Sequence, residues 1–310
     1  MKQFELKIRL EQSEINISSD VIGIDIGQSL TKVAYLKENE IILSISQTGS
    51  DFRKIIEFLD SNRKKFNSIN FTGGKAFSLY KKYSNKTETN LINEFEANIE
   101  GLEFLYNHYK NKALPASLVV TIGTGTSIVL KSDNVKERSD SDHFLNSNIE
   151  HIGGSAMGGG LFMGLIKLLF NLDDYLDAID LSRKGNRFNI DLKVADIYNV
   201  EDTRVNKLFR EFTAASLGKI KKDFDVKSLK KEDLINSLIG IIGENIGTIA
   251  TLMAENYNIK NIVFCGGFLL ENKPLKQILS LLCKLKRKKA IFLTNSEYCG
   301  AIGALLFNSK

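Results

Sequence analysis

Two apolar runs separated by a small polar turn carry the residues best suited to chemistry, in the stretch 21–36. Asp25 lies where the first run ends, and Gly27, Gln28 and Ser29 form the turn before the second run. Apolar, β-branched runs on both sides of such a turn predict a β-hairpin. The backbone N–H groups of the turn and the Ser29 hydroxyl can bind an anion. A carboxylate beside an anion implies a cation, so Asp25 predicts Mg²⁺ shared with a nucleotide; the plainer alternative is a tight hairpin with a solvated Asp.

A second stretch repeats this form. An apolar run at 118–122 is followed by Gly-Thr-Gly-Thr-Ser at 123–127 and by a returning apolar run at 127–130. The repetition predicts two related α/β domains that face each other, each with a phosphate-binding turn at the cleft between them. The glycines at 158–160 open an expected helix at 161–170, where amides and the positive end of the helix dipole can meet a phosphate.

Around these turns the chain alternates strands and helices. Further strands are expected at 41–46, 68–71, 261–265 and 290–293, and helices at 51–65, 78–83, 93–109, 173–181, 194–198, 211–223, 233–257, 276–285 and 300–304. Glycine turns also follow strands at Gly73 and Gly266, and parallel α/β proteins bind ligands at such strand ends. The spacing matches neither the dinucleotide fingerprint G-x-G-x-x-G nor the phosphate loop G-x-x-x-x-G-K-[ST]. By elimination, the pattern indicates a two-lobed ATPase cleft.

Composition limits the class of protein. The chain has 310 residues, 43% hydrophobic and 25% charged, which is typical of a globular protein with two domains. Its net charge of +5 suits an anionic small molecule, and the basic run 284–289 lacks aromatic residues, so no nucleic-acid partner is expected. Three cysteines and three histidines lack the spacing of a zinc site or a disulfide framework, which favours a reducing, cytoplasmic location.

Two segments lie outside the alternating pattern. Residues 1–20 contain no apolar h-region, so they predict no signal peptide. They form an N-terminal extension that is either an extra strand at 4–10 or a mobile segment. Residues 131–148 are polar and charged, and they predict a long mobile loop or an extended hairpin.

The apolar segment 234–253 is long enough to be tested as a membrane span. Polar residues such as Asn236 and Glu244 would be costly inside a bilayer. A buried helix is therefore expected, in which Gly240, Gly243 and Gly247 allow another helix to approach closely. A dimer contact through these glycines is the remaining alternative, and no membrane partner is expected.

Seven short motifs occur together in one order. They are Gly-Ile-Asp-Ile-Gly-Gln-Ser-Leu-Thr-Lys (23–32), Phe-Thr-Gly-Gly (71–74), Glu-Phe-Glu-Ala (94–97), Ile-Gly-Thr-Gly-Thr-Ser (122–127), Gly-Gly-Gly (158–160), Asp-Leu-Lys-Val-x-x-Ile-Tyr (191–198) and Gly-Ala-Ile-Gly-Ala-Leu (300–305). In order and spacing they resemble the type II pantothenate kinases. One such motif is a weak signal, whereas seven in order are specific. The resemblance covers nearly the whole chain from Val21, except the loop 131–148.

The resemblance implies the α/β fold of the actin, sugar kinase and heat-shock ATPase superfamily, which is ribonuclease H-like, with ATP between two lobes. The lobes would be 21–117 and 118–310, with a final helix at 297–308 packed back on the first lobe. The implied activity is ATP- and Mg²⁺-dependent phosphorylation of the primary hydroxyl of pantothenate, the first step towards coenzyme A. A homodimer is also implied, while feedback by coenzyme A or its acyl thioesters stays open.

Phosphoryl transfer needs phosphates held in line and a base for the acceptor hydroxyl. Glu94 is the candidate base, because the matching Glu has this role in the resembled family. With Asn93 as N-cap, Glu94 would begin a helix that carries its carboxylate to the cleft. The plainer alternative is a glutamate stabilised by the helix dipole or by solvent. Glu96 competes for the role, but it should point away from the cleft.

The ATP-binding residues that the resemblance implies come from five parts of the chain. They are Asp25, Gly27, Gln28, Ser29, Leu30, Thr31, Lys32, Thr124, Gly125, Gly158, Gly159, Gly160, Leu161, Phe162, Tyr175 and Gly267. Asp25 would also hold Mg²⁺, directly or through water. Thr124, Ser127 and His151 are expected to bind substrate. Lys32 could equally be a surface lysine, and Tyr175 a half-buried aromatic residue.

Two departures from the family pattern affect the site. The family has Arg where this chain has His151, just before the glycine-rich helix start. A guanidinium is always charged and binds bidentately, whereas histidine changes charge near neutral pH. Either His151 takes the role conditionally, or activity is lower, or Arg138 in the 131–148 loop substitutes. The second departure is Gln28-Ser29 in place of Gly-Thr, which keeps the hydroxyl and adds a side chain in the turn.

Two other functions remain open from the sequence. One is a sugar or N-acetylhexosamine kinase of the same superfamily, although many of these carry a zinc motif that is absent here. The other is a regulatory protein that binds nucleotide or acyl coenzyme A without transferring phosphate. An active pantothenate kinase is the preferred interpretation.

Overall fold

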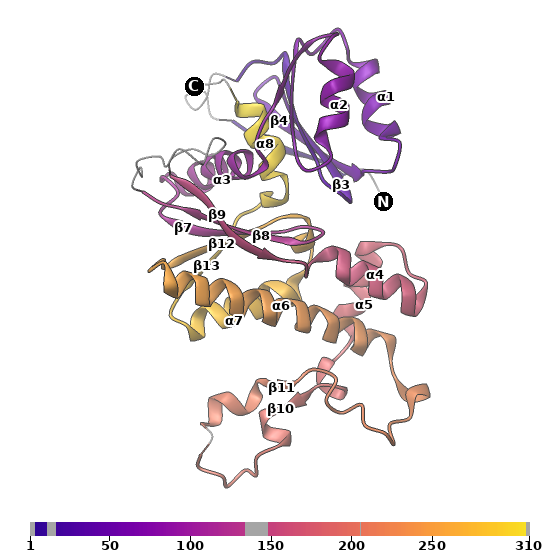
Figure 1. The fold of residues 1–310 in the computed structure, drawn as a ribbon, viewed down its shortest axis with the longest axis vertical. Helices are drawn as coiled ribbons and strands as arrows, with labels where there is room; N and C mark the ends of the chain where they lie inside the picture. Colours follow the sequence, from indigo (N-terminus) through magenta and orange to yellow (C-terminus); the bar gives the residue numbers. More distant parts are fainter. Residues whose placement is uncertain (1–3, 11–16, 134–147, 205, 308–310) are drawn as a thin grey trace.

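Two large β-sheets organise the part of the chain that the computed structural model describes, residues 4–10, 17–133, 148–204 and 206–307 (Figure 1). The first sheet has the strand order β1-β4-β3-β2-β5-β6, and the second has the order β13-β12-β7-β8-β9. The strands of the first sheet are β1 (Phe4–Arg9), β2 (Val21–Ile26), β3 (Leu30–Lys37), β4 (Glu40–Gln47), β5 (Ser68–Thr72) and β6 (Glu88–Leu91). Those of the second sheet are β7 (Ser117–Ile122), β8 (Thr126–Lys131), β9 (Ile149–Ser155), β12 (Asn261–Cys265) and β13 (Lys289–Phe292).

The two sheets share one topology. In each, a hairpin supplies two antiparallel strands, a third antiparallel strand pairs with its second strand, and two parallel strands extend the other side. The order β4-β3-β2-β5-β6 therefore corresponds to β9-β8-β7-β12-β13. The predicted duplication of an α/β unit is confirmed. Each hairpin turn lies at the carboxyl end of a strand that also belongs to the parallel part of its sheet, where ligands bind in such folds.

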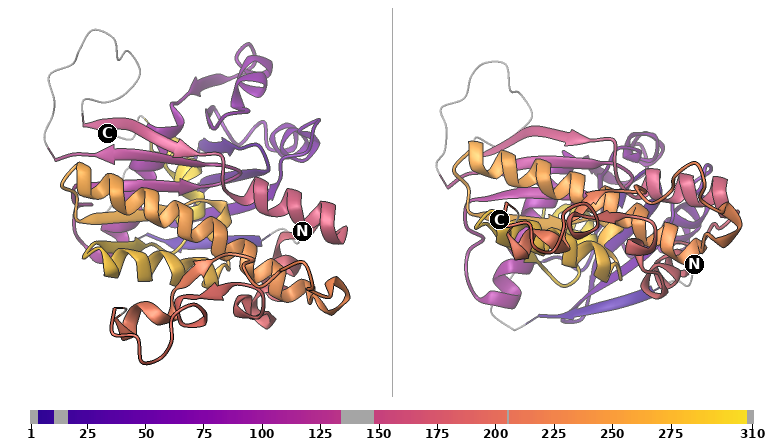
Figure 2. Two further views of the ribbon diagram at one scale, coloured as in Figure 1. Left: turned by 60° about the horizontal axis from the view of Figure 1, so that its bottom comes forward. Right: turned by 90° about the horizontal axis from the view of Figure 1, so that it is seen from below.

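Helices separate and cover the sheets in layers (Figures 1 and 2). α1 (Arg53–Ser61) and α2 (Ala76–Tyr83) share a buried core with the outer face of the first sheet. α3 (Glu94–Lys110) and α8 (Cys299–Leu306) lie between the two sheets and share a core with both. α6 (Lys231–Asn256) and α7 (Lys273–Leu285) cover the far face of the second sheet, with α4 (Gly159–Phe170) and α5 (Tyr175–Lys184) beside them.

α3 and α8 pack with their backbones in close contact. A β-carbon at Gly303 would overlap the backbone of Ala97, and one at Gly101 would overlap the backbone of Cys299. α8 also packs against β2, where a β-carbon at Gly23 would overlap its backbone. The small residues of the 300–305 motif are therefore explained by packing. They bring the end of the chain to the strand that precedes the first hairpin turn.

α6 is a core helix. It is long and apolar enough to cross a membrane, but 61% of its most apolar window is buried inside the protein. Gly243 faces Leu275 and Ile278 of α7, and Gly247 faces Leu282, so the predicted close helix approach is confirmed there. Because the chain itself covers these glycines, they give no support to the alternative of a dimer contact.

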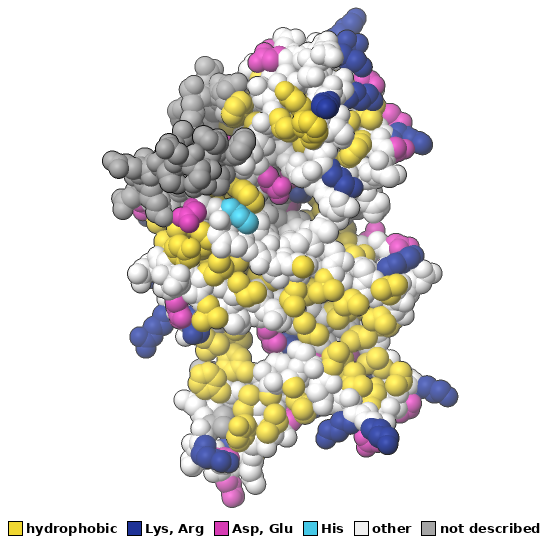
Figure 3. All heavy atoms as spheres, in the orientation of Figure 1, with side chains coloured by type: hydrophobic (Ala, Val, Ile, Leu, Met, Phe, Trp, Pro, Cys, Tyr) yellow, Lys and Arg dark blue, Asp and Glu magenta, His cyan; other side chains and the backbone are white. Residues whose placement is uncertain are grey.

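Gly240 has a different partner, in a segment of residues 187–230 that we call the arm. The guanidinium of Arg187 fills the space where a β-carbon of Gly240 would lie. Arg187 donates from Nε to Asp191 over 2.6 Å and lies 3.1 Å from Glu244, which ties the arm to α6. The arm extends below α6 in Figure 1 and contains β10 (Leu192–Lys193) and β11 (Thr213–Ala215). In the space-filling view of Figure 3, hydrophobic side chains gather over this lower half of the molecule.

The arm also contains the main error of secondary-structure prediction. No α-helix covers 211–223: Glu211 ends the 3-10 turn Lys207–Glu211, and the rest forms β11 and turns. Leu217 adopts a positive φ of 56°, and its N–H donates to Asp191, so tertiary contacts override the helical pattern. The expected helix at 194–198 is a short 3-10 turn (Val194–Asp196), and β6 and β9 were not expected.

The outer segments give a mixed result. The alternative of an extra strand near the N-terminus is confirmed, because β1 pairs antiparallel with β4. Of the expected loop at 131–148, residues 134–147 lie outside the described residues, and so does Arg138. The described ends of this segment lead from β8 into β9, which pair antiparallel.

Candidate active site

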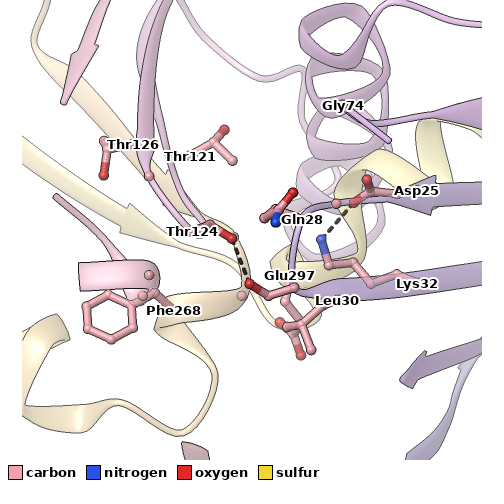
Figure 4. A pocket seen from close by; sticks show the side chains of 18 of the residues that line it. Asp25, Gln28, Leu30, Lys32, Gly74, Thr121, Thr124, Thr126, Phe268 and Glu297 are labelled. Atoms are coloured by element: carbon pink, nitrogen blue, oxygen red, sulfur yellow. Dashed lines mark hydrogen bonds and ion pairs between the residues drawn. The ribbon is translucent and has the colours of Figure 1, made fainter. Parts of the chain in front are cut away.

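A cavity of about 850 Å³ is lined by both hairpin turns (Figure 4). The structure brings most of the predicted site residues to it. They are Asp25, Gly27, Gln28, Ser29, Leu30, Lys32, Glu94, Thr124, Gly125, Ser127, Gly159, Gly160, Tyr175 and Gly267. These residues come from segments as far apart as β2 and the turn after β12. The cavity is large enough for a nucleotide and a small acceptor together.

The two hairpin turns touch each other at the cavity. The hydroxyl oxygens of Ser29 and Thr124 lie 2.9 Å apart, within hydrogen-bond distance (Figure 4). Within the described residues, no protein acceptor takes the backbone amides of Gln28, Ser29, Thr124 or Gly125. Unused amides and hydroxyls converging on one space form a site suited to an anion.

The start of α4 is bonded to the second turn. The amide of Gly159 donates to the carbonyl of Gly123 over 2.8 Å, and the amide of Gly160 donates to that of Thr124 over 2.9 Å. These two amides were expected to hold phosphates, but both are already used within the chain. A β-carbon at Gly160 would also overlap Thr124, so glycine is required for this contact. The glycines therefore fix the shape of the turn rather than offer free donors.

Asp25 and Lys32 form an ion pair inside the cavity. The two residues lie directly opposite each other on β2 and β3, and Nζ of Lys32 donates to Oδ2 of Asp25 over 2.7 Å (Figure 4). Burial acts to lower the pKa of Lys32, but the charge and hydrogen bond of Asp25 outweigh it and raise the pKa. The ammonium therefore stays charged, and Lys32 is not a surface lysine.

Glu94 reaches the cavity from the first residue of α3. The side chain of Asn93 accepts from the amides of Phe95 and Glu96, so the predicted N-cap is confirmed. Burial and the nearby charge of Asp25 raise the pKa of Glu94, while Lys32 opposes this shift. Glu96 does not line the cavity. A partly buried carboxylate with a raised pKa, close to a cation, is a suitable general base.

An apolar and aromatic wall closes another part of the cavity. Leu30, Met163, Tyr175 and Phe268 line it. The phenol oxygen of Tyr175 lies 2.8 Å from the carbonyl oxygen of Phe268, which can accept its proton. Burial raises the pKa of this phenol. The hydroxyl of Tyr175 is thus engaged within the protein, and its ring is the part that can contact a ligand.

Five predicted site residues do not line the cavity. They are Thr31, Gly158, Leu161, Phe162 and His151. Thr31 is buried against Thr48, because its side chain points to the opposite face of β3 from Lys32. Phe162 is fully buried in the core of the second lobe. Gly158 is the N-cap residue of α4, and Leu161 is partly exposed on this helix.

His151 is exposed and lies outside the cavity. Its ring stacks on Phe95 with centroids 4.6 Å apart and planes inclined by 10°. Phe95 itself lines the cavity, so His151 is one side chain removed from it. The stacking follows from β9, which carries His151 and was not predicted as a strand.

Sequence reasoning missed several cavity residues, above all Glu297. Glu297 comes from the short turn Ser296–Tyr298, Cys299 is the first residue of α8, and Asn98 belongs to α3. Their approach depends on the packing of α8 against α3, which no local pattern encodes. The one available signal was position, since Glu297 lies three residues before the first residue of the 300–305 motif.

The chain is similar to known proteins over nearly its full length. A family model described as Fumble matches residues 21–307. The type II pantothenate kinase of Bacillus cereus strain G9842 is 32% identical over 290 residues, covering 93% of this chain and 98% of that protein. The type II pantothenate kinase of Oceanobacillus iheyensis is 34% identical over 291 residues, with 92% and 98% covered.

Solved structures share the architecture. The activator of 2-hydroxyisocaproyl-CoA dehydratase from Clostridium difficile, with bound ADPNP, has a TM-score of 0.57 at 15% identity and covers 93% of each chain. A ROK family glucokinase from Streptomyces griseus, in complex with glucose and AMPPNP, has a TM-score of 0.53 at 10% identity, with 93% and 98% covered. These likenesses show the fold alone, which is the two-lobed α/β fold of actin-like ATPases. The family model and the two relatives show that the chain belongs to the Fumble family of type II pantothenate kinases.

Proposed function

We propose that this protein transfers the γ-phosphoryl group of ATP to the primary hydroxyl of pantothenate. Family membership supports the reaction, and the cavity supports it by its contents. The observation that carries the proposal is that Glu94 and the Asp25–Lys32 ion pair line one cavity. Both hairpin turns line the same cavity. Residues 21–117 and 118–310 would act as the two lobes that hold ATP.

In this mechanism the hairpin turns hold the phosphates. The unused amides of Gln28, Ser29, Thr124 and Gly125 and the two hydroxyls would donate to the triphosphate oxygens. Lys32 would neutralise charge on the γ-phosphate as the acceptor oxygen approaches. Because the donors are fixed by strand and turn geometry, little reorganisation is needed when charge moves in the transition state.

Glu94 would take the proton of the acceptor hydroxyl. The proton passes to the carboxylate while the hydroxyl oxygen forms a bond to the γ-phosphorus and the bond to the leaving ADP oxygen breaks. The raised pKa of Glu94 makes it a better proton acceptor than an ordinary exposed glutamate. Ser127, Thr124 and Phe95 line the cavity and would orient the acceptor, and His151 would hold Phe95 in place by stacking on it from outside.

A magnesium ion fits the residues present. Mg²⁺ usually binds proteins through one or two carboxylates together with substrate phosphates and water. Asp25 supplies one such carboxylate in the cavity, and within the described residues no cluster of three metal-ligating side chains was found. Asp25 would hold the ion directly or through water, and the ion would supply neutralisation of phosphate charge.

Further expectations of the family are part of this proposal. The protein would act as a homodimer in the cytoplasm, at the first step of coenzyme A synthesis. Coenzyme A thioesters are candidate feedback ligands, because their pantetheine part contains the same chemical groups as the acceptor pantothenate.

A coupled assay of ADP release tests the proposed function. Pantothenate, N-acetylglucosamine and a sample without acceptor are compared at equal ATP and Mg²⁺. Of the three samples, only the one with pantothenate is expected to release ADP above background. Turnover with N-acetylglucosamine instead would favour a sugar kinase. Nucleotide binding without turnover on either acceptor would favour a regulatory protein.

A further inference from the structure

Glu297 is a cavity carboxylate that the mechanism above does not use. It lies in the short turn Ser296–Tyr298, just before α8. Across the residues that the structure describes, no other side chain hydrogen-bonds or ion-pairs with its carboxylate, and its own backbone N–H is the donor it has. Burial raises the pKa of Glu297, because a charged carboxylate loses hydration in this position. A half-buried carboxylate that lines a ligand cavity and accepts few hydrogen bonds from the protein is suited to accept hydrogen bonds from a ligand.

Charge interactions link the Glu297 carboxylate to residues at both ends of the cavity. The charges of Lys276 and Lys32 both lower the pKa of Glu297, and of these two lysines Lys32 lines the cavity, at the end of the hairpin turns. At the other end, the pKa of Tyr175 is raised by burial and, to a smaller extent, by the charge of Glu297. In Figure 4, Glu297 lies beside Leu30, with Lys32 and Asp25 on one side of it and with Thr124 and, farther away, Phe268 on the other side.

The two ends suit different parts of a nucleotide. The amides and hydroxyls of the turns suit phosphates, whereas Leu30, Tyr175 and Phe268 offer the apolar surface that suits a base. Leu30 and Gly267 lie in contact, because a β-carbon at Gly267 would be 2.9 Å from the Leu30 side chain. The apolar wall of the cavity is therefore continuous from the first hairpin turn to the turn after β12. The part of a nucleotide that lies between its phosphates and its base is the ribose.

We propose that Glu297 accepts hydrogen bonds from the 2′ and 3′ hydroxyls of the nucleotide ribose and makes the site selective for ribonucleotides. A carboxylate has two oxygens and can accept from two neighbouring hydroxyls at once, which is how acidic residues bind ribose in dinucleotide sites. A phosphate beside Glu297 would be repelled, and an aromatic base face would leave its oxygens without donors. This inference rests on the proposed function only in requiring a nucleotide in the cavity.

Calorimetric binding of nucleoside diphosphates tests the proposal without any acceptor or turnover. ADP, 2′-deoxyADP, 3′-deoxyADP and inosine diphosphate are titrated into the full-length wild-type protein with Mg²⁺. The same titrations follow with Glu297→Gln, with Glu297→Ala and with the control Glu57→Gln, which removes an exposed carboxylate from α1. Thermal unfolding of each variant reports whether it is folded.

The wild type is expected to bind ADP about tenfold more tightly than either deoxynucleotide, as for one charge-assisted hydrogen bond. Both Glu297 variants should weaken ADP, which donates two such bonds, by more than about tenfold, and each deoxynucleotide, which donates one, by up to about tenfold, while Glu57→Gln changes none of them. Equal binding of ADP and both deoxynucleotides by the wild type overturns the proposal, whether or not the variants fold. A Glu297 variant that weakens the binding of all nucleotides equally also overturns the proposal. A Glu297 variant that loses only the distinction between ADP and inosine diphosphate overturns it as well, because this result would place Glu297 at the base.

Failure here is distinguishable from failure of the proposed function. If ADP binds with the expected preference but pantothenate gives no turnover, the ribose contact stands and the kinase assignment falls. If ADP binds without the preference and pantothenate is phosphorylated, the reverse holds. If ADP does not bind at all, both are wrong.

Discussion

The hydroxyl groups of Ser29 and Thr124 lie 2.9 Å apart and join the first hairpin turn to the second. The residues are separated by 95 positions in the sequence and belong to different sheets. Through this contact the anion-binding parts of both sheets act as one site. A triphosphate held by both turns would depend on both hydroxyls together, so their removal should not have independent effects.

The first prediction concerns this pair. Ser29→Ala and Thr124→Ala should each raise the KM for ATP by about three- to tenfold, the worth of one neutral hydrogen bond. The double variant should raise it by less than the product of the two factors, because the hydroxyls contact each other. Steady-state kinetics at saturating acceptor measure this, with Ser280→Ala on the exposed face of α7 as control. Unchanged KM values in both single variants would remove the pair from the ATP site.

The second prediction concerns the general base. Glu94→Gln should lower kcat by about 10²–10⁴-fold, the usual contribution of such a group, because the amide cannot take the acceptor proton. ADP affinity should change little, since the phosphates are held by the hairpin turns. The matched control is Glu96→Gln on the same helix, which should keep its rate because Glu96 does not line the cavity. A Glu94→Gln enzyme with most of its turnover would exclude Glu94 as the base.

The third prediction is the pH dependence of the reaction. Burial and Asp25 raise the pKa of Glu94 above its ordinary value of 4.5, and the base must be ionised to act. The acidic limb of kcat/KM should therefore inflect above pH 4.5. Lys32→Met removes the charge that lowers this pKa, so the inflection of its residual activity should move to higher pH. Lys54→Met, on the exposed face of α1, should leave the inflection in place. An inflection at or below the ordinary value would contradict the assignment.

The same shift predicts a stability effect of opposite sign to the activity effect. The pKa of Glu94 is higher in the folded protein than in the unfolded chain, so between the two values the folded state binds more protons. The free energy of unfolding therefore falls as pH rises through this window, and at pH 7 the ionised carboxylate destabilises the fold. Glu94→Gln should raise the thermal unfolding midpoint at pH 7 and have little effect below pH 4. A lower midpoint at pH 7 would mean that Glu94 has stabilising partners.

The features predicted correctly from sequence are those that local patterns determine. The hairpin around Asp25 and the cap of Asn93 before Glu94 depend on neighbours within a few residues. The duplication of the sheet topology was visible because both hairpins repeat the same order of apolar run, polar turn and apolar run. For these features the sequence contains most of the information that the structure uses.

The features that were missed depend on contacts between distant parts of the chain. Glu297 reaches the cavity because α8 returns to pack on α3 through Gly303 and Gly101. The amides of Gly159 and Gly160 were expected to be free, but the turn after β7 takes both. A glycine run predicts close approach of backbones, yet it does not say whether the close neighbour is a ligand or the protein itself.

The fourth prediction concerns His151, which stacks on Phe95. His151→Arg should give an equal or higher rate and a flatter pH profile near neutrality, because a guanidinium can stack on the same ring and keeps its charge at all pH values tested. The matched variant His151→Gln removes the imidazole and with it the aromatic stack on Phe95, and it should lower the rate. Rate and pH profile are measured together from pH 6 to pH 8.5. If neither variant changes them, His151 has no part in the reaction.

The fifth prediction tests the contact that carries α8 to the cleft. In Gly303→Ala the new β-carbon would overlap the backbone of Ala97, where no flexible side chain can yield. Overpacking of this kind should lower the free energy of unfolding by about 1–3 kcal/mol, and nucleotide affinity should fall with it because Glu297 and Cys299 move with α8. Gly164→Ala is the matched control: a β-carbon there meets no atom within 4 Å, and alanine favours the helix by about 1 kcal/mol. Denaturant unfolding and ADP titration of both variants measure this. If Gly303→Ala were as stable as Gly164→Ala, the close α3–α8 contact would not hold the site together.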